Sequence, residues 1–178
     1  EAVSLVPVID TGEIERDESG LAGETSLALG RRGGRPGFAR PRQVAMGLFG
    51  VLIVRPAAGV CATTCAYDNA STFATEEVVV LSEIDPALNA NPAAFRMEDF
   101  NPPYRLINGK VFPSVRPMVC KTGDKIRLRL GNLGAMDHHP IHLHGFHFRI
   151  TATDGEDIPL SAQWPETTVL AAVGQTRT

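Results

Sequence analysis

Residues 137–148 read Asp137-His138-His139-Pro140-Ile141-His142-Leu143-His144-Gly145-Phe146-His147-Phe148, and they contain all five histidines of the 178-residue chain. Histidines scattered by chance would not gather in this way. Among side chains, neutral imidazole is the commonest metal ligand. The stretch therefore predicts a metal site carried on one strand.

The spacing of three of these histidines predicts how the metal site is divided. Alternate side chains of a strand point to opposite faces, and residues two apart on one face are separated by about 6.5–7 Å. His142 and His144 should project to the same side, at a spacing that suits two metals of a cluster with one histidine each. His139 has the opposite parity and should face a second metal position, and Pro140 stiffens the entrance of the strand.

The other two histidines are not assigned to the metal. His138 is expected in a loop, and His147 has the parity of the face away from His142 and His144. A single histidine is ordinarily a surface or core residue without metal, but the H-x-x-H-x-H spacing favours ligation. The candidate metal ligands are therefore His139, His142 and His144.

The remainder of the chain favours an all-β fold. Strand-like patterns occur at 47–54, 76–81, 104–107, 125–130, 142–152 and 167–173. Asn108-Gly109 predicts a tight hairpin turn, and the alternation of charged and apolar residues over 125–130 is typical of a half-buried strand. Short strands at this spacing, without a long helical period, predict an antiparallel β-sandwich.

Composition divides the chain into three parts. Residues 1–45 are acid-rich and then rich in Gly, Arg and Pro, which predicts an irregular segment. Residues 46–75 contain one strand and a small, polar connection, and residues 76–178 contain the other strands and the histidines. A basic arm that binds an anion or nucleic acid is the weaker interpretation of the Gly/Arg/Pro stretch, because a single aromatic residue, Phe38, interleaves for stacking.

The overall charge and hydropathy exclude some partners. A formal net charge of −3 and a pI near 6.0 give no reason to expect nucleic acid or an anionic membrane surface. The longest apolar run, residues 48–54, is far shorter than the ~20 residues that cross a bilayer. We therefore expect no membrane span.

The three cysteines cannot all pair with one another. Cys61 and Cys65 are close enough in sequence for a disulfide or a weak metal pair, and the C-x3-C spacing leaves both open. Cys120 has a strand-like context and is expected to be a small buried apolar residue.

The H-x-H pattern of His142 and His144 also occurs in two other kinds of metal site. A mononuclear zinc hydrolase would need three protein ligands and an open position, so a carboxylate or a cysteine would have to join His142 and His144. A cupin-type iron site also begins with H-x-H on a strand, but Phe148 and Arg149 stand where its glutamate should follow. This absence counts against a cupin.

The segment His139-Pro140-Ile141-His142-Leu143-His144-Gly145 resembles the H-P-x-H-L-H-G motif of multicopper oxidases, laccase-like proteins built from cupredoxin domains. Residues 81–86, 106–110, 122–129 and 152–155 also resemble the domain that carries this motif, and residues 47–54 resemble the strand that closes the family's first domain. The resemblance covers residues 46–178 and implies a cupredoxin-like, antiparallel Greek-key β-sandwich.

The resemblance implies a copper-dependent oxidoreductase. His139 would be a type 1 copper ligand, His142 a type 2 ligand and His144 a type 3 ligand, which agrees with the strand parity. In the family, type 1 copper takes single electrons from a reducing substrate, and a trinuclear cluster reduces O2 to water. The implied partners are a small reducing substrate and O2, and the implied location is extracellular or periplasmic.

The chain departs from the family pattern in its number of ligands. It contains one His-x-His motif where the family has four, and no H-C-H motif occurs before Thr178. A type 1 site needs a cysteine thiolate with two histidines, and Cys120 lies in a different motif. We expect a truncated member that is inactive alone and is completed, if at all, by a partner chain or in a homotrimer like that of two-domain members. The alternative is a non-catalytic cupredoxin-like copper-binding or structural subunit.

Overall fold

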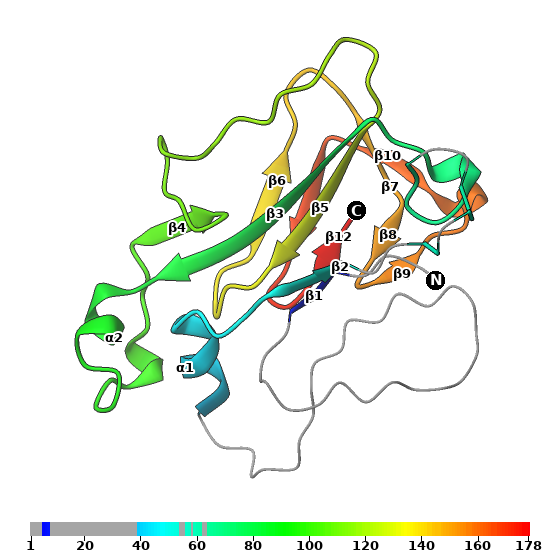
Figure 1. The fold of residues 1–178 in the computed structure, drawn as a ribbon. Coiled ribbons are helices and arrows are strands. Elements are labelled where there is room, and N and C mark those ends of the chain that lie inside the picture. The colour runs from blue at the N-terminus through cyan, green and yellow to red at the C-terminus, as the bar shows by residue number, and fades with distance from the viewer. Residues whose placement is uncertain (1–4, 8–38, 54–55, 58, 62–63) are drawn as a thin grey trace, which may run out of the picture.

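The computed structural model describes residues 5–7, 39–53, 56–57, 59–61 and 64–178, and these are almost entirely strands, turns and loops (Figure 1). The strands are β1 Leu5–Pro7, β2 Val51–Ile53, β3 Thr75–Ile84, β4 Tyr104–Ile107, β5 Ile126–Asn132, β6 His139–His142, β7 Phe148–Ile150, β8 Ala152–Thr153, β9 Glu156–Asp157, β10 Trp164–Glu166, β11 Thr168–Ala171 and β12 Thr176–Arg177. The helices are α1 Ala39–Ala45 and α2 Pro86–Ala90, with 3-10 turns at Asn69–Ser71, Met97–Asp99 and Leu160–Ala162. The predicted all-β class is confirmed. No helix of the described ranges is long and apolar enough to span a membrane.

The largest sheet has the strand order β4-β3-β5-β12-β8-β9, and separate pairs are formed by β6 with β11, β7 with β10, and β1 with β2. All these pairings are antiparallel except that of β3 with β5, in which Val79 lies opposite Leu130. Parallel neighbours need a long crossover, and residues 85–125, which include α2 and β4, supply it. The sheet is therefore mixed, where the sequence predicted a purely antiparallel one.

The main core joins strands of different sheets. Leu130 of β5, Ile150 of β7 and Val169 of β11 form one buried cluster, with Val79 and Ile141 packed against it. The large sheet therefore packs face to face with the β6·β11 and β7·β10 pairs, as a sandwich requires. This arrangement leaves the other face of β6 exposed, and His142 projects from it.

A smaller cluster lies under the helices at one end of β3 (Figure 1). Ala45 of α1 packs with Leu88 of α2 and with Phe100. The carboxylate of Asp85 starts α2 by accepting the backbone N–H of Ala87 at 2.8 Å, and it also accepts the N–H of Asn101 at 3.0 Å. The crossover between β3 and β5 is thus anchored at its beginning.

The sequence predicted one strand over 142–152, but β6 ends at His142 and β7 begins at Phe148. His142 lies opposite Thr168 and Phe148 lies opposite Glu166, so five residues on one side face only Thr167 on the other. The surplus residues leave the sheet as a loop, and Gly145 turns with a φ of 81°. The prediction of one continuous strand over 142–152 was wrong. β10 and β11 leave only Thr167 between them, so residues 143–147 have no strand to pair with.

Two other predicted segments match the structure only in part. Only Val51–Ile53 is a strand within 47–54, because the segment follows α1 and Gly47 has a left-handed φ of 87°. The turn at Asn108-Gly109 is confirmed, with φ values of 50° and 74° and two hydrogen bonds of 2.9 and 3.0 Å between Ile107 and Lys110. Beyond Lys110, no strand continues the hairpin before β5.

The N-terminal 45 residues contain β1 and α1, and β1 pairs with β2. The rest of that segment, including most of the Gly/Arg/Pro stretch, lies outside the described residues, and the division of the chain into three parts stays a prediction.

Cys61 and Cys65 form a disulfide with their Cα atoms 6.2 Å apart. Cys120 is a free, exposed thiol, so the prediction that it is buried was wrong. It lies in the β3–β5 crossover, outside the strands and helices of the described residues.

A buried polar cluster attaches the connection before β3 to the sheet. Arg129 is 1% exposed, and its Nε donates to the Glu76 carboxylate at 2.6 Å. The Arg127 guanidinium lies over the ring of Tyr67, 5.3 Å from its centroid. Burial, and then the nearby carboxylate of Asp157, raise the pKa of Tyr67 to about 12. This phenol is therefore held neutral within the fold.

Candidate metal centre

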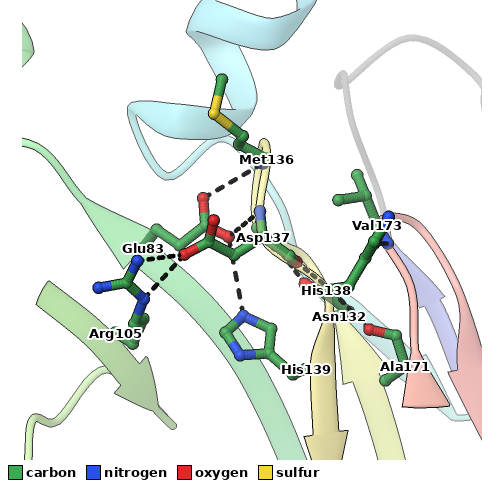
Figure 2. Close-up of polar contacts among 10 residues, drawn as sticks. Glu83, Arg105, Asn132, Met136, Asp137, His138, His139, Ala171 and Val173 are labelled. Carbon is green, nitrogen blue, oxygen red and sulfur yellow. Dashed lines mark hydrogen bonds and ion pairs between the residues drawn. The ribbon is translucent and has the colours of Figure 1, made fainter. Parts of the chain in front are cut away.

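Asn132, the last residue of β5, forms a hydrogen bond to the loop that leads into β6, the strand with His139 and His142 (Figure 2). Its side chain is completely buried and donates to the carbonyls of Asp137 and Ala171 at 2.8 and 2.9 Å. Its Oδ1 accepts the N–H of Gly134 at 2.9 Å. This one side-chain amide therefore links β5, β11 and the loop between β5 and β6. Its partner in that loop, Asp137, lies two residues before His139.

Glu83 near the end of β3 holds the same loop from the opposite side. The residue is 4% exposed, and its carboxylate accepts the backbone N–H groups of Asp137 at 2.7 Å and Met136 at 3.2 Å. The loop is also held at the surface, because Arg105 contacts the Asp137 carboxylate through Nε at 2.8 Å and Nη2 at 2.7 Å (Figure 2). A Cβ at Gly134 would collide with the Glu83 carboxylate, so only glycine fits there.

His139 opens β6 and points into the space beside Glu83 (Figure 2). Its side chain is 15% exposed, and its Nε2 lies 3.7 Å from Oε1 of Glu83. That separation is too long for a hydrogen bond, and Nε2 is buried without a hydrogen-bond partner among the described residues. The ring of His139 is therefore enclosed, with one nitrogen facing a carboxylate.

His142 and His144 lie together on the exposed side. Their ring centroids are 4.9 Å apart, with the planes inclined at 67°. Nδ1 of His142 is 2.7 Å from the hydroxyl of Thr168, which lies directly across the β6·β11 pair. A ligating histidine usually engages its second nitrogen in this way, so His142 has Nε2 left to offer a metal.

The structure brings two of the three predicted ligands together and sets the third apart. Side chains along β6 alternate, with His139 turned inward and His142 exposed. His142 therefore faces away from His139, as strand alternation predicts, whereas His144 lies in the loop after β6, where strand parity no longer applies. Of the unassigned histidines, His138 accepts the backbone N–H of Val173 at 3.2 Å through Nδ1, and His147 is exposed.

The donor atoms that the histidines offer favour some metals over others. Imidazole nitrogens suit copper, whereas a type 1 copper site also requires a thiolate. No group of three or more His, Cys, Asp or Glu side chains that could hold a metal ion occurs within the described part of the chain. The imidazoles therefore suit copper ligation, but the described residues by themselves assemble no complete site for either copper or zinc.

Sequence reasoning missed the residues that support the histidine strand. Glu83 precedes Asp137 by 54 positions, and Arg105 precedes it by 32. Such contacts have no local spacing signal, because the β3–β5 crossover creates them. Asn132, at the end of a regular strand, likewise gave no sign of its role.

Known proteins resemble this chain in sequence and in fold. A family profile described as multicopper oxidase matches residues 85–178. The blue copper oxidase of Nitrosomonas europaea superposes with a TM-score of 0.60 at 30% identity, over 74% of this chain and 38% of that one. No curated protein sequence matches the chain.

Two more distant structures are similar in fold. The multicopper oxidase mgLAC gives a TM-score of 0.59 at 23% identity, over 74% of this chain and 38% of that one. The laccase of Botrytis aclada gives 0.50 at 22% identity, over 76% and 26%. These two structures and the Nitrosomonas europaea oxidase confirm the cupredoxin-like fold class. The chain spans 38% of the length of the Nitrosomonas europaea oxidase and of mgLAC. Because the profile covers more than half of the sequence, the chain belongs to the multicopper oxidase family.

Proposed function

We propose that this chain is a copper-binding portion of an oxidase that couples one-electron oxidation of a small donor to reduction of O2 to water. The observation that carries the proposal is the two-sided arrangement of β6. His142 and His144 share the exposed side, with ring centroids 4.9 Å apart. His139 is turned to the enclosed side next to Glu83.

We assign His139 to a type 1 position, His142 to a type 2 position and His144 to a type 3 position. Copper, when bound, supplies one-electron redox chemistry between donor and O2. The residues of the chain orient the ligands: the Thr168 hydroxyl fixes Nδ1 of His142 at 2.7 Å, and Asn132 and Glu83 fix the strand entrance. The assignment places the type 1 position at the start of β6, and the type 2 and type 3 positions at its end and just beyond it.

The remaining ligands must come from outside this histidine segment, because the chain has no other histidine. We propose that a further part of the protein or a partner chain, as in a homotrimer, supplies them together with the type 1 thiolate. An extracellular or periplasmic location is part of the same proposal. The Cys61–Cys65 disulfide supports it, because disulfides persist in oxidising compartments.

Metal analysis and an oxygen electrode test this function. The chain is purified from copper-supplemented cells and assayed for copper, zinc and O2 consumption with a phenolic or diamine donor. Copper with O2 consumption that is lost in His142→Ala supports the oxidase. Copper without turnover is the result expected of the chain alone, whereas copper without turnover in the assembly that contains the missing ligands favours the non-catalytic copper-binding subunit. Stoichiometric zinc without copper contradicts both.

A further inference from the structure

We propose that the buried polar cluster on the large sheet forms a site for one internal water molecule, held by the hydroxyl of Tyr67, Nη2 of Arg129 and Oδ1 of Asp157. These three atoms are buried, and none of them has a hydrogen-bond partner among the described residues. Buried polar atoms rarely remain without a partner, so three of them in one cluster require an explanation. The inference does not depend on copper binding.

Strand alternation brings Arg129 and Asp157 to the same face of the large sheet. Leu130 and Ile158, the residues that follow them, pack in the main core, so Arg129 and Asp157 point to the opposite face. Arg129 lies on β5, and Asp157 lies on β9 at the edge of the sheet. The cluster therefore lies on the side of the large sheet that is turned away from β6 and its histidines.

Tyr67 reaches this face from the connection that precedes β3. The guanidinium of Arg127, which shares a face of β5 with Arg129, lies 5.3 Å from the centroid of the Tyr67 ring. Burial first, and then the Asp157 carboxylate, raise the pKa of Tyr67 to about 12, whereas the charge of Arg129 acts in the opposite direction. The phenol, the guanidinium of Arg129 and the carboxylate therefore lie together between the connection, β5 and β9.

One water molecule would satisfy all three atoms. A guanidinium nitrogen only donates hydrogen bonds, a carboxylate oxygen only accepts them, and a phenol does both. Nε of Arg129 donates to Glu76 at 2.6 Å, which holds the guanidinium in place. Water at this position accepts from Nη2, donates to Oδ1 and bonds to the hydroxyl, and buried waters typically make about three such bonds.

The charges of the cluster select a small neutral molecule. The cations Arg127 and Arg129 stand against the carboxylates of Glu76 and Asp157, so a further ion of either sign would be buried without a counter-charge of its own. The site instead requires a donor and an acceptor in one small molecule. Water provides both.

The connection before β3 closes this site from solvent. The backbone N–H of Phe73 donates to the carbonyl of Thr64 at 3.2 Å, which folds residues 64–73 back on themselves. The guanidinium of Arg127 also lies 5.7 Å from the centroid of the Phe73 ring. A water molecule held here exchanges with solvent only when this segment lifts from the sheet, so it should be long-lived.

A crystal structure of the purified chain tests the site directly. We expect one water molecule within hydrogen-bond distance of the Tyr67 hydroxyl, Nη2 of Arg129 and Oδ1 of Asp157. A direct hydrogen bond between Tyr67 and Asp157 without an intervening water overturns the inference. So does a cluster that is open to bulk solvent.

Oxygen-17 relaxation dispersion tests the site in solution, because it counts the water molecules that a protein holds for much longer than its surface waters. Tyr67→Ala opens the site and should lower this count by one water per chain. Tyr104→Ala, at an exposed position, is the matched control and should leave the count unchanged. An unchanged count in folded Tyr67→Ala overturns the inference, and if that variant does not fold, the crystal structure of the unmodified chain decides.

Discussion

The side-chain amide of Asn132 lies 2.8 Å from the carbonyl oxygen of Asp137 and donates a hydrogen bond to it. This bond joins the end of β5 to the residue that precedes the histidine run. The same amide reaches Ala171 of β11, so the strand that carries the ligands is fixed between its two neighbours.

Replacing Asn132 by leucine should destabilise the fold strongly. The change leaves the carbonyls of Asp137 and Ala171 and the N–H of Gly134 without their partners, and each unsatisfied buried group costs about 1–3 kcal/mol. We expect a loss of at least about 3 kcal/mol in the free energy of unfolding, measured by urea denaturation. Asn89→Ala, at an exposed position, should change it by less than about 0.5 kcal/mol. Equal effects of the two changes would contradict the role of Asn132.

Gly134→Ala should disturb the same loop by crowding. The new methyl group would meet the Glu83 carboxylate and Oδ1 of Asn132, and overpacking of this kind costs about 1–3 kcal/mol. Gly50→Ala is the matched control, because a Cβ there meets nothing within 4 Å. Thermal unfolding of both variants checks the prediction, and an unaffected Gly134→Ala would show that the loop yields.

Replacing His142 and His144 together by alanine should abolish copper binding at the exposed side of β6. The two rings are in contact and no third ligand group accompanies them among the described residues. His147→Ala should be nearly silent, because this exposed ring is separated from the pair by the turn at Gly145. Isothermal titration with copper measures both, and equal losses would mean that the ligands are assigned wrongly.

Stability should fall at alkaline pH because of Tyr67. Its pKa is raised to about 12 in the folded chain by burial and by Asp157, from an ordinary value of 10.0. The unfolded chain loses this proton first, so the stabilisation is complete below pH 10 and is lost as the pH rises towards 12. We expect a decrease of about 2 kcal/mol over this range.

Denaturation curves at several alkaline pH values measure this decrease. Tyr67→Phe should flatten the pH dependence, and Tyr104→Phe, at an exposed position, should preserve it. A wild-type slope in Tyr67→Phe would assign the effect to another group.

The free thiol of Cys120 should react in the folded protein. It is exposed, whereas Cys61 and Cys65 are joined in a disulfide. Iodoacetamide without reductant should therefore modify one cysteine per chain, identified by mass spectrometry of peptides. Protection of Cys120 until the chain is unfolded would restore the original prediction that it is buried.

The sequence by itself determined the elements that depend on local pattern. The alternating charges near Arg127 predicted β5, and the Asn108-Gly109 pair predicted its turn, because left-handed φ values favour these residues. The parity of β6 likewise separated His139 from His142, because alternation is a property of any strand. The family resemblance, which rests on the same local motif, was also visible in the sequence.

Only the tertiary structure decided what surrounds these elements. Glu83 and Arg105 reach the Asp137 loop across 54 and 32 positions, and the break at Gly145 follows from the register of β10 and β11. Cys120 is exposed in the β3–β5 crossover, outside the strands that form the core. The physical reason is common to all of these cases: side-chain direction repeats with the local backbone, whereas contact partners depend on which distant strands pair.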